Sequence, residues 1–216
     1  MRQGFLAFAL ILLLASVPAG AEEPAESLGN WDFDVYLNDK KVGKHRFHVA
    51  AAADGVTKVR SEADFDYKVL FFTAYRYEHT AAESWSGDCL AEFAANTNAN
   101  GDQIQVSGQK SGTGFVVETD GEPVELPECV MTFAYWNPAF LNEPRLLNPQ
   151  TGEYLVVEVE QTGKEALEVR GQTVPATRFR LRADKVDLTL WYSADDRWLA
   201  LESVARGGHI IRYELS

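Results

Sequence analysis

Alternation of apolar and polar residues with a period of two constrains this chain more than any other feature of its sequence. Residues 31–37 read WDFDVYL, residues 155–160 read LVVEVE and residues 178–182 read RFRLR, so apolar side chains gather on one parity. Glycine, asparagine and aspartate interrupt the pattern about every ten residues. No run of helical period is long enough to predict a helix. We therefore expect an all-β, mainly antiparallel fold. A sandwich and a closed barrel are alternatives to the form we predict, a strongly curved sheet or open half barrel.

Residues 130–153, here called the central segment, divide two blocks of this β pattern. The segment contains Pro138, Pro144 and Pro149, which forbid a continuous strand or a long helix. It is also too apolar for a solvated linker, because its aromatic and leucine side chains would leave a large exposed patch. We expect a proline-rich, partly helical lid that lies across the concave side of the sheet.

The first 21 residues have the pattern of a secretory signal peptide. Arg2 precedes a short apolar run, and Ala19-Gly20-Ala21 supplies a cleavage site after Ala21. The apolar run is shorter than the roughly 20 residues that span a membrane, so a membrane anchor is the weaker interpretation. We expect a periplasmic or secreted protein with one β domain over residues 22–216 and no transmembrane segment in the mature chain.

The charge of the chain limits its partners. The formal net charge is −12, and loss of a leader whose only charged residue is Arg2 makes it −13. Nucleic acid and anionic lipid surfaces both require a basic protein surface, so neither is an expected partner. No cofactor motif occurs, and we predict no cofactor.

Cys89 and Cys129 are the two cysteines, and both follow the leader. In an exported protein such a pair predicts a disulfide bond, whereas a partial metal site would need nearby histidines. His45 and His48 cannot easily share a metal, because residues three apart on a strand lie on opposite faces. We predict a Cys89–Cys129 bond and no metal site.

The run 56–85 is the longest strand-like stretch, with aromatic residues on one parity and charged residues on the other. Its sequence is apolar on both parities at residues 70–72, which predicts a bend or cover on both sides there. Aromatic rings with polar tips suit either an ordinary core or a pocket for an apolar molecule. The residues that we predict to bind a ligand are Tyr75, Tyr77, His79, Phe133, Trp136, Phe140, Arg145 and Asn148.

Two further groups of residues have functional and structural interpretations. Glu78 and His79, with Glu83, offer an acid and a base, but no G-x-S-x-G nucleophile motif accompanies them, and we assign no catalytic residue. Arginines 178, 180 and 182 form a basic stripe that could bind an anionic head group. Pairing with glutamates on a neighbouring strand explains the stripe without a ligand.

Five motifs together resemble an uncharacterised family of exported bacterial β-proteins, a domain of unknown function. They are His45-Arg46-Phe47, Tyr75-Arg76-Tyr77-Glu78-His79, Phe133-Ala134-Tyr135-Trp136, Leu146-Leu147-Asn148-Pro149-Gln150-Thr151-Gly152 and Leu190-Trp191-Tyr192. That family has no assigned activity to transfer. The ending from Trp191 to Leu215 is similar, in its hairpin pattern, to the half-barrel carriers of the LolA/LolB type. Likeness of fold says little about function.

The leading functional hypothesis is a periplasmic, non-enzymatic binding or carrier protein for a hydrophobic or amphipathic molecule. One alternative is an envelope accessory protein whose aromatic lid docks a protein partner and binds no small molecule. The other alternative is a hydrolase or isomerase that uses His79 and Glu78. The sequence contains no feature that names the ligand.

Overall fold

The computed structural model describes residues 26–52, 55–69 and 72–216 and places most of them in β-strands. The predicted signal peptide lies outside these residues. The first eight strands are β1 (Glu26–Leu37), β2 (Lys40–Ala51), β3 (Val56–Val69), β4 (Phe72–Ser86), β5 (Cys89–Ala99), β6 (Asp102–Ser111), β7 (Gly114–Thr119) and β8 (Glu122–Leu126). Each pairs antiparallel with the next, as a meander.

The central segment follows β8, and the second block of strands follows the segment. Within the segment lie the 3-10 helix η1 (Pro138–Asn142) and β9 (Arg145–Leu147), which pairs with β10 (Tyr154–Val156) as a separate hairpin. The remaining elements are β11 (Glu158–Val169), β12 (Gln172–Ala183), β13 (Val186–Tyr192), β14 (Trp198–Val204), the short 3-10 turn η2 (Arg206–Gly208) and β15 (Ile210–Leu215).

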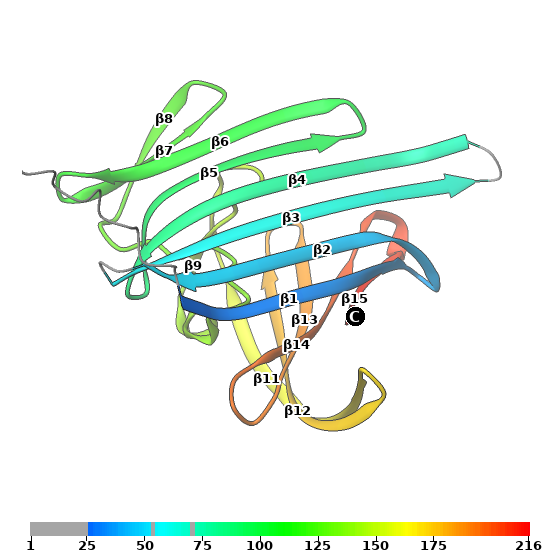
Figure 1. The fold of residues 1–216 in the computed structure, drawn as a ribbon. Helices are drawn as coiled ribbons and strands as arrows, with labels where there is room; N and C mark the ends of the chain where they lie inside the picture. The colour runs from blue at the N-terminus through cyan, green and yellow to red at the C-terminus, as the bar shows by residue number, and fades with distance from the viewer. Residues whose placement is uncertain (1–25, 53–54, 70–71) are drawn as a thin grey trace, which may run out of the picture.

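Thirteen of the described strands form one antiparallel sheet, because β15 pairs with β1 and joins the two blocks. The strand order is β11-β12-β13-β14-β15-β1-β2-β3-β4-β5-β6-β7-β8, so the sheet is open, with β11 and β8 at its edges. In Figure 1 the long strands β1–β6 run across the view, whereas β11–β14 run at a steep angle to them. The predicted all-β, strongly curved, half-barrel fold is confirmed.

Short hairpin turns set the register between neighbouring strands. Asn100 and Gly101 both have positive φ, at 59° and 104°, and so do Asp120 and Gly121, at 49° and 89°. Asn-Gly and Asp-Gly tolerate this conformation, whose twist matches that of the flanking strands. The turn signals in the sequence therefore lie where the structure reverses direction.

One predicted run is divided in the structure. The sequence indicated a single strand-like stretch over 56–85, but β3 ends at Val69 and β4 begins at Phe72, and the two strands pair antiparallel. The bend predicted at residues 70–72 falls largely outside the described residues. Parity alone could not separate one long strand from a hairpin, because the hairpin keeps the aromatic residues on one face: Phe65 is opposite Tyr77.

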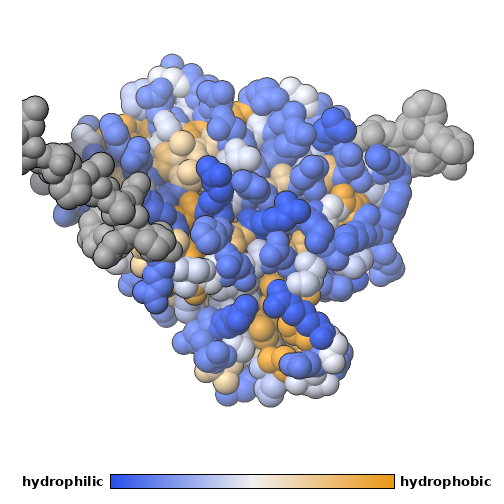
Figure 2. Space-filling view, in the orientation of Figure 1, coloured by the Kyte–Doolittle hydropathy of each residue, from blue (hydrophilic) through white to orange (hydrophobic). Residues whose placement is uncertain are grey.

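The hydrophobic core lies on the concave face of the sheet. Side chains of alternate parity are buried along each strand, as Phe33 and Val35 show at 0 % exposure on β1. In Figure 2 most of the visible surface is hydrophilic, and hydrophobic residues gather near β13 and β14. No helix among the described residues has the length and apolar character that a membrane span requires.

Candidate functional site

The central segment covers the concave face of the sheet, as the sequence predicted. Its helix η1 begins after Asn137, whose Oδ1 accepts a hydrogen bond from the Ala139 N–H at 3.1 Å. This cap satisfies one of the amide groups that a helix start leaves without a partner. The side chains that the segment contributes to the buried core are Val130, Met131, Ala134, Phe140, Leu146 and Leu147. The segment is therefore a lid whose inner side is packed.

A disulfide bond fastens one end of this lid to the sheet. Cys89, the first residue of β5, is bonded to Cys129, and their Cα atoms lie 4.9 Å apart. Beside the bond, the Leu90 N–H donates to the Val130 carbonyl at 2.9 Å. The predicted disulfide is confirmed, and it is consistent with an oxidising environment outside the cytoplasm.

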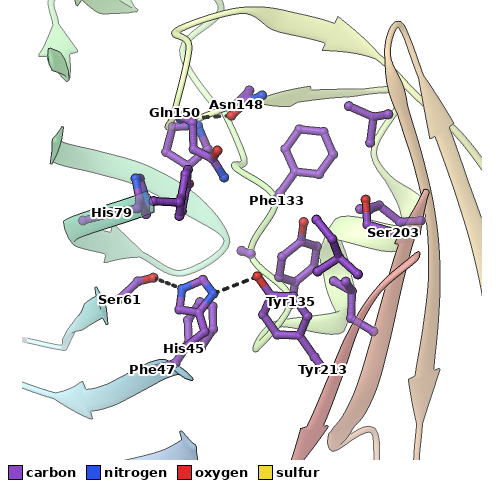
Figure 3. A pocket seen from close by; sticks show the side chains of 18 of the residues that line it. His45, Phe47, Ser61, His79, Phe133, Tyr135, Asn148, Gln150, Ser203 and Tyr213 are labelled. Atoms are coloured by element: carbon purple, nitrogen blue, oxygen red, sulfur yellow. Dashed lines mark hydrogen bonds between the residues drawn. The ribbon is translucent and has the colours of Figure 1, made fainter. Parts of the chain in front are cut away.

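A cavity of about 340 Å³ lies between the other part of the lid and the sheet (Figure 3). Its floor comes from β2, β3 and β4, its roof from residues 133–136 and 148–150, and its far wall from β13, β14 and β15. This volume falls within the range of small-molecule binding sites.

The register of β2, β3 and β4 builds the cavity floor. His45 pairs with Ala63, and Ala63 pairs with His79, so both imidazoles lie in one row of the concave face with a methyl group between them. The outer two of these strands are roughly 10 Å apart, at about 4.8 Å for each strand pair. In the next row Ser61 is opposite Ala81. Small side chains at these positions leave the volume unfilled.

Aromatic rings form much of the cavity wall. Phe65 and Tyr77 are stacked, with their ring centroids 5.3 Å apart, and Phe133 and Tyr135 lie opposite in the lid. The Tyr192 hydroxyl donates to the Tyr135 carbonyl oxygen at 2.8 Å, which ties the lid to β13. An apolar molecule would therefore contact rings from both the sheet and the lid.

His45 is a buried histidine whose two ring nitrogens both contact protein groups. Nε2 lies 2.7 Å from Ser61 Oγ, and Nδ1 lies 3.3 Å from the Tyr213 hydroxyl. Burial, with a smaller contribution from the charge of His79, lowers the pKa of His45 to about 3. The imidazole is therefore neutral at neutral pH.

His79 differs from His45 because a described residue bonds only one of its ring nitrogens. Nδ1 lies 2.9 Å from Thr97 Oγ1, and no hydrogen bond joins Nε2 to any part of the chain that the structure describes. Burial lowers the pKa of His79 to about 4, so this ring is also neutral at neutral pH. His79 lines the cavity and can offer Nε2 to a ligand.

Glu83 and Trp136 add two further polar groups to the cavity lining. Burial raises the pKa of Glu83 to about 7, although hydrogen bonds from the Trp85 indole at 2.9 Å and the Thr132 hydroxyl at 3.4 Å oppose the change. Trp136 Nε1 is buried and finds no hydrogen-bond partner among the described residues. An unpaired buried N–H costs free energy, so an acceptor from a ligand would stabilise it.

Six of the eight residues predicted to bind a ligand line this cavity: Tyr75, Tyr77, His79, Phe133, Trp136 and Asn148. Phe140 and Arg145 do not. Phe140 is fully buried in the core, and the Arg145 guanidinium lies over the Tyr154 ring at 5.4 Å from its centroid. Parity placed the strand residues, but it could not give the directions of side chains within the irregular lid.

Sequence reasoning missed His45, Ser61, Glu83 and Tyr213 as parts of the cavity lining. A signal for three of them was present, because His45, Ser61 and Glu83 share the parity of the apolar residues on their strands. A polar residue on the apolar parity indicates either a satisfied core group or a site. Tyr213 carried no such signal.

The proposed pairing of Glu78 with His79 is contradicted by the alternation of side chains along β4. His79 is 3 % exposed and faces the cavity, whereas Glu78 is exposed and accepts a hydrogen bond from Asn98 Nδ2 at 3.1 Å. Adjacent residues of a strand point to opposite faces. The two side chains therefore cannot act together as acid and base.

The contact between Ser61 and His45 has the spacing of a nucleophile and its base, but its surroundings do not activate it. The nitrogen of His45 that faces away from Ser61 contacts the Tyr213 hydroxyl, where a triad would place a carboxylate. Burial also makes His45 a weak base. This geometry suits the binding of a polar group better than the removal of a proton from serine.

The arginine stripe of β12 lies beside acidic residues, as expected. The register pairs Arg182 with Glu158 and Arg180 with Glu160. Arg180 also forms a two-pronged ion pair with Asp187, at 3.0 and 2.7 Å. The stripe is thus compensated by the protein's own carboxylates. Nowhere in residues 26–52, 55–69 or 72–216 do three or more His, Cys, Asp or Glu side chains gather as metal ligands would.

The fold and the site together define an antiparallel β protein with an open, barrel-like sheet and a lidded cavity. Residues 33–216 match the family described as "Domain of unknown function (DUF6134)", and the chain belongs to that family. The family resemblance read from the sequence is thus confirmed as membership of a domain family of unknown function.

Among solved structures, the fold is similar to a beta-barrel-like protein of the domain of unknown function DUF1849 from Brucella abortus. The TM-score is 0.62 at 7 % sequence identity, and the match covers 87 % of this chain and 94 % of that one. At this identity the similarity shows the fold alone. No curated protein matches the chain. The expected likeness to LolA/LolB-type carriers is not confirmed by these comparisons.

Proposed function

We propose that this protein is a non-enzymatic binding or carrier protein of the periplasm or another exported location. In this proposal a hydrophobic or amphipathic small molecule occupies the cavity beneath the central segment. The observation that carries the proposal is an aromatic-walled hollow of about 340 Å³ between the lid and the concave face of the sheet.

The energetics of packing support a ligand in this hollow. Protein interiors are close-packed, and unfilled volume among core side chains lowers stability. The floor comes from β2, β3 and β4 and the roof from the lid, so side chains from separate parts of the chain together leave this volume open. A ligand that is regularly bound would restore the lost contacts and would explain the small residues Ser61 and Ala81 on the floor.

The polar groups in the lining support an amphipathic ligand over a purely apolar one. Neither the Trp136 N–H nor the Nε2 atom of His79 has a hydrogen-bond partner among the described residues. An empty apolar cavity would contain neither group. A molecule with one polar end and an apolar body fits both the rings and these two nitrogens.

The arrangement of the aromatic residues of the lid does not favour the alternative of a protein-docking lid. The Trp136 ring packs edge-on against Trp85 beneath the lid, with the ring centroids 5.5 Å apart, and Phe140 is fully buried. These rings contact the protein's own core and cavity. With the lid in this position, a partner protein would meet only part of the Trp136 side chain and none of Phe140.

The test begins with native mass spectrometry and organic extraction of the exported, purified chain. We expect a co-purifying small molecule, or uptake of a fluorescent fatty alcohol by the stripped protein. The matched variants are Ala81→Leu and Ala95→Leu. These two alanines are cross-strand partners on the concave face and are 5 % and 2 % exposed, but only Ala81 lines the cavity.

Ala81→Leu should abolish uptake and leave the melting temperature unchanged or higher, because the added side chain fills the hollow. Ala95→Leu should lower stability by about 1–3 kcal/mol through overpacking. Its uptake of ligand should match that of the parent protein as long as the variant is folded. If the stripped protein takes up no apolar or amphipathic molecule, and if both leucine variants are equally destabilised, the cavity is not a binding site.

A further inference from the structure

The polarity of the cavity lining says more about the ligand than its volume does. Resting on the binding function proposed above, we infer that the ligand is uncharged and enters with its polar end first. A hydroxyl or carbonyl oxygen of the ligand then meets His79 Nε2 inside the cavity, and the apolar body lies between the aromatic walls.

Exposure of the lining residues distinguishes the mouth of the cavity from its shielded interior. Tyr75, Gln150 and Lys185 line the cavity and are exposed, so they mark the mouth. His45 and His79 line the same cavity and are 8 % and 3 % exposed. The imidazoles are therefore shielded from solvent inside the cavity, in contrast to a site whose polar group stays at the opening.

Hydrogen-bonding capacity selects His79 over His45 as the group inside the cavity that contacts the ligand. The nitrogens of His45 are both occupied, by Ser61 and Tyr213 (Figure 3). His79 contacts Thr97 through Nδ1 alone, which leaves Nε2 for another group. Nε2 can donate or accept, depending on the tautomer that Thr97 selects, so it suits a hydroxyl or a carbonyl oxygen.

The charges that line the cavity argue against an ionic ligand. The lysine at the mouth, Lys185, lies beside Asp184 at 3.5 Å, with its side chain 76 % exposed. Inside the cavity both imidazoles are neutral, so a carboxylate there would be desolvated without a cation to balance it. An ammonium group would have only the Glu83 carboxyl to pair with, and that group accepts hydrogen bonds from Trp85 and Thr132 and is only partly ionised near neutral pH, because burial raises its pKa to about 7.

The experiment compares ligands of one chain length that differ only in their polar end. Octane, octanol, octanone, octanoate and octylamine are added in turn to the stripped full-length protein near neutral pH. Binding is measured by the rise in melting temperature, followed by tryptophan fluorescence, since a ligand that binds only the folded state stabilises it. We expect octanol and octanone to bind about tenfold more tightly than octane, and octanoate and octylamine to bind more weakly than octane.

Substitutions of His79 test the contact itself. His79→Leu removes the ring nitrogens and should reduce octanol affinity about tenfold, to the level of octane. His79→Gln keeps a terminal amide that can donate and accept, so it should retain most of the preference for octanol. His48→Leu is the matched control, because His48 lies on the opposite, exposed face of the sheet and contacts Asn30.

The outcomes separate the two proposals. If no member of the series binds, the binding function itself fails. If members bind but octanoate or octylamine is the tightest, or if His79→Leu keeps the full preference for octanol, the cavity is a binding site and the inference about the polar end is wrong. Melting of each variant without ligand, measured first, confirms that it is folded.

Discussion

The central segment covers the concave face of the sheet, and that face has a filled end over β5–β7 and a hollow end over β2–β4, where residues 133–136 and 148–150 roof the cavity. At the filled end, Phe93 and Phe115 pack so closely that a Cβ atom on Gly108 would lie 2.6 and 2.5 Å from their rings. At the hollow end, Ser61 and Ala81 occupy the equivalent inward positions on β3 and β4. The same sheet runs through both ends, so the difference lies in the size of the inward side chains on β3 and β4 compared with those on β5 and β7.

This comparison shows how a sheet can keep a regular alternation of apolar and polar side chains and still enclose a cavity. Phenylalanine and alanine are both apolar, so either can occupy an inward position, and the period of two continues through both ends. The filled end also holds the disulfide and the fully buried leucines 146 and 147. We infer that the filled end anchors the lid and that the hollow end is left free for binding.

The largest effect should come from truncating one ring at each end of the lid. Phe140 is fully buried, so Phe140→Ala should destabilise the protein by about 3–5 kcal/mol. Phe133 adjoins the cavity and is only partly buried, so Phe133→Ala should cost roughly 1–2 kcal/mol. Chemical denaturation of both variants measures the two values. Equal losses would show that the lid is anchored along its whole length.

Loss of the disulfide should have the next largest effect, and it acts on the filled end. The bond closes a 40-residue separation, which on the loop-entropy description stabilises the fold by at most about 4 kcal/mol. Cys89→Ala with Cys129→Ala should therefore lower the melting temperature by several degrees. If the double variant melts like the parent protein, the hydrogen bond between Leu90 and Val130 holds the lid without the covalent bond.

Much of this fold could be predicted from the alternation and the turn residues, including the curved antiparallel sheet and the disulfide. The lid was also predictable, since Pro138, Pro144 and Pro149 exclude a strand while the apolar residues demand cover. The division of the run 56–85 into two strands was not, because a hairpin preserves parity. The size of the cavity depends on which inward residues are small, and that becomes visible only when the register is known.

The candidate site was predictable in part, for a related physical reason. Tyr77 and His79 line the cavity, and parity made their shared face predictable, because it fixes the face of a strand on which a side chain lies. Arg145 was predicted at the site but lies over Tyr154, since no period governs side chains in an irregular segment. His45 escaped notice because its partners, Ser61 and Tyr213, are distant in the sequence.

Between about pH 5 and 8, the sensitivity of stability to pH should come mainly from the hollow end, with opposite signs for its two kinds of group. The pKa of His45 and His79 is lowered from 6.5 to about 3 and about 4, so the unfolded state binds more protons below about pH 6.5. Stability then falls as the pH falls towards those values, by about 2 kcal/mol for each histidine by about pH 5. His79→Gln should remove its share of this loss.

Glu83 should act in the other direction. Its pKa is raised from 4.5 to about 7, so the folded state holds the proton more tightly, and stability falls as the pH rises from about 4.5 through 7. Glu83→Gln should abolish this loss of stability with rising pH. The loss of stability with falling pH that comes from the histidines should remain. Unfolding free energies at several pH values measure both effects. A parent protein whose stability is flat between about pH 5 and 8 would contradict the burial of all three groups.

The smallest effect on stability should come from the outer face of the sheet, opposite the concave face that carries the filled and hollow ends. Arg180 and Asp187 form an ion pair there, but their side chains are 42 % and 34 % exposed, so solvent screens the attraction. Arg180→Gln should therefore lower stability by less than about 1 kcal/mol and leave ligand uptake unchanged. Denaturation and uptake are measured on the same variant. If uptake falls, the stripe on β12 contacts the ligand, and the division between a binding concave face and a structural outer face is wrong.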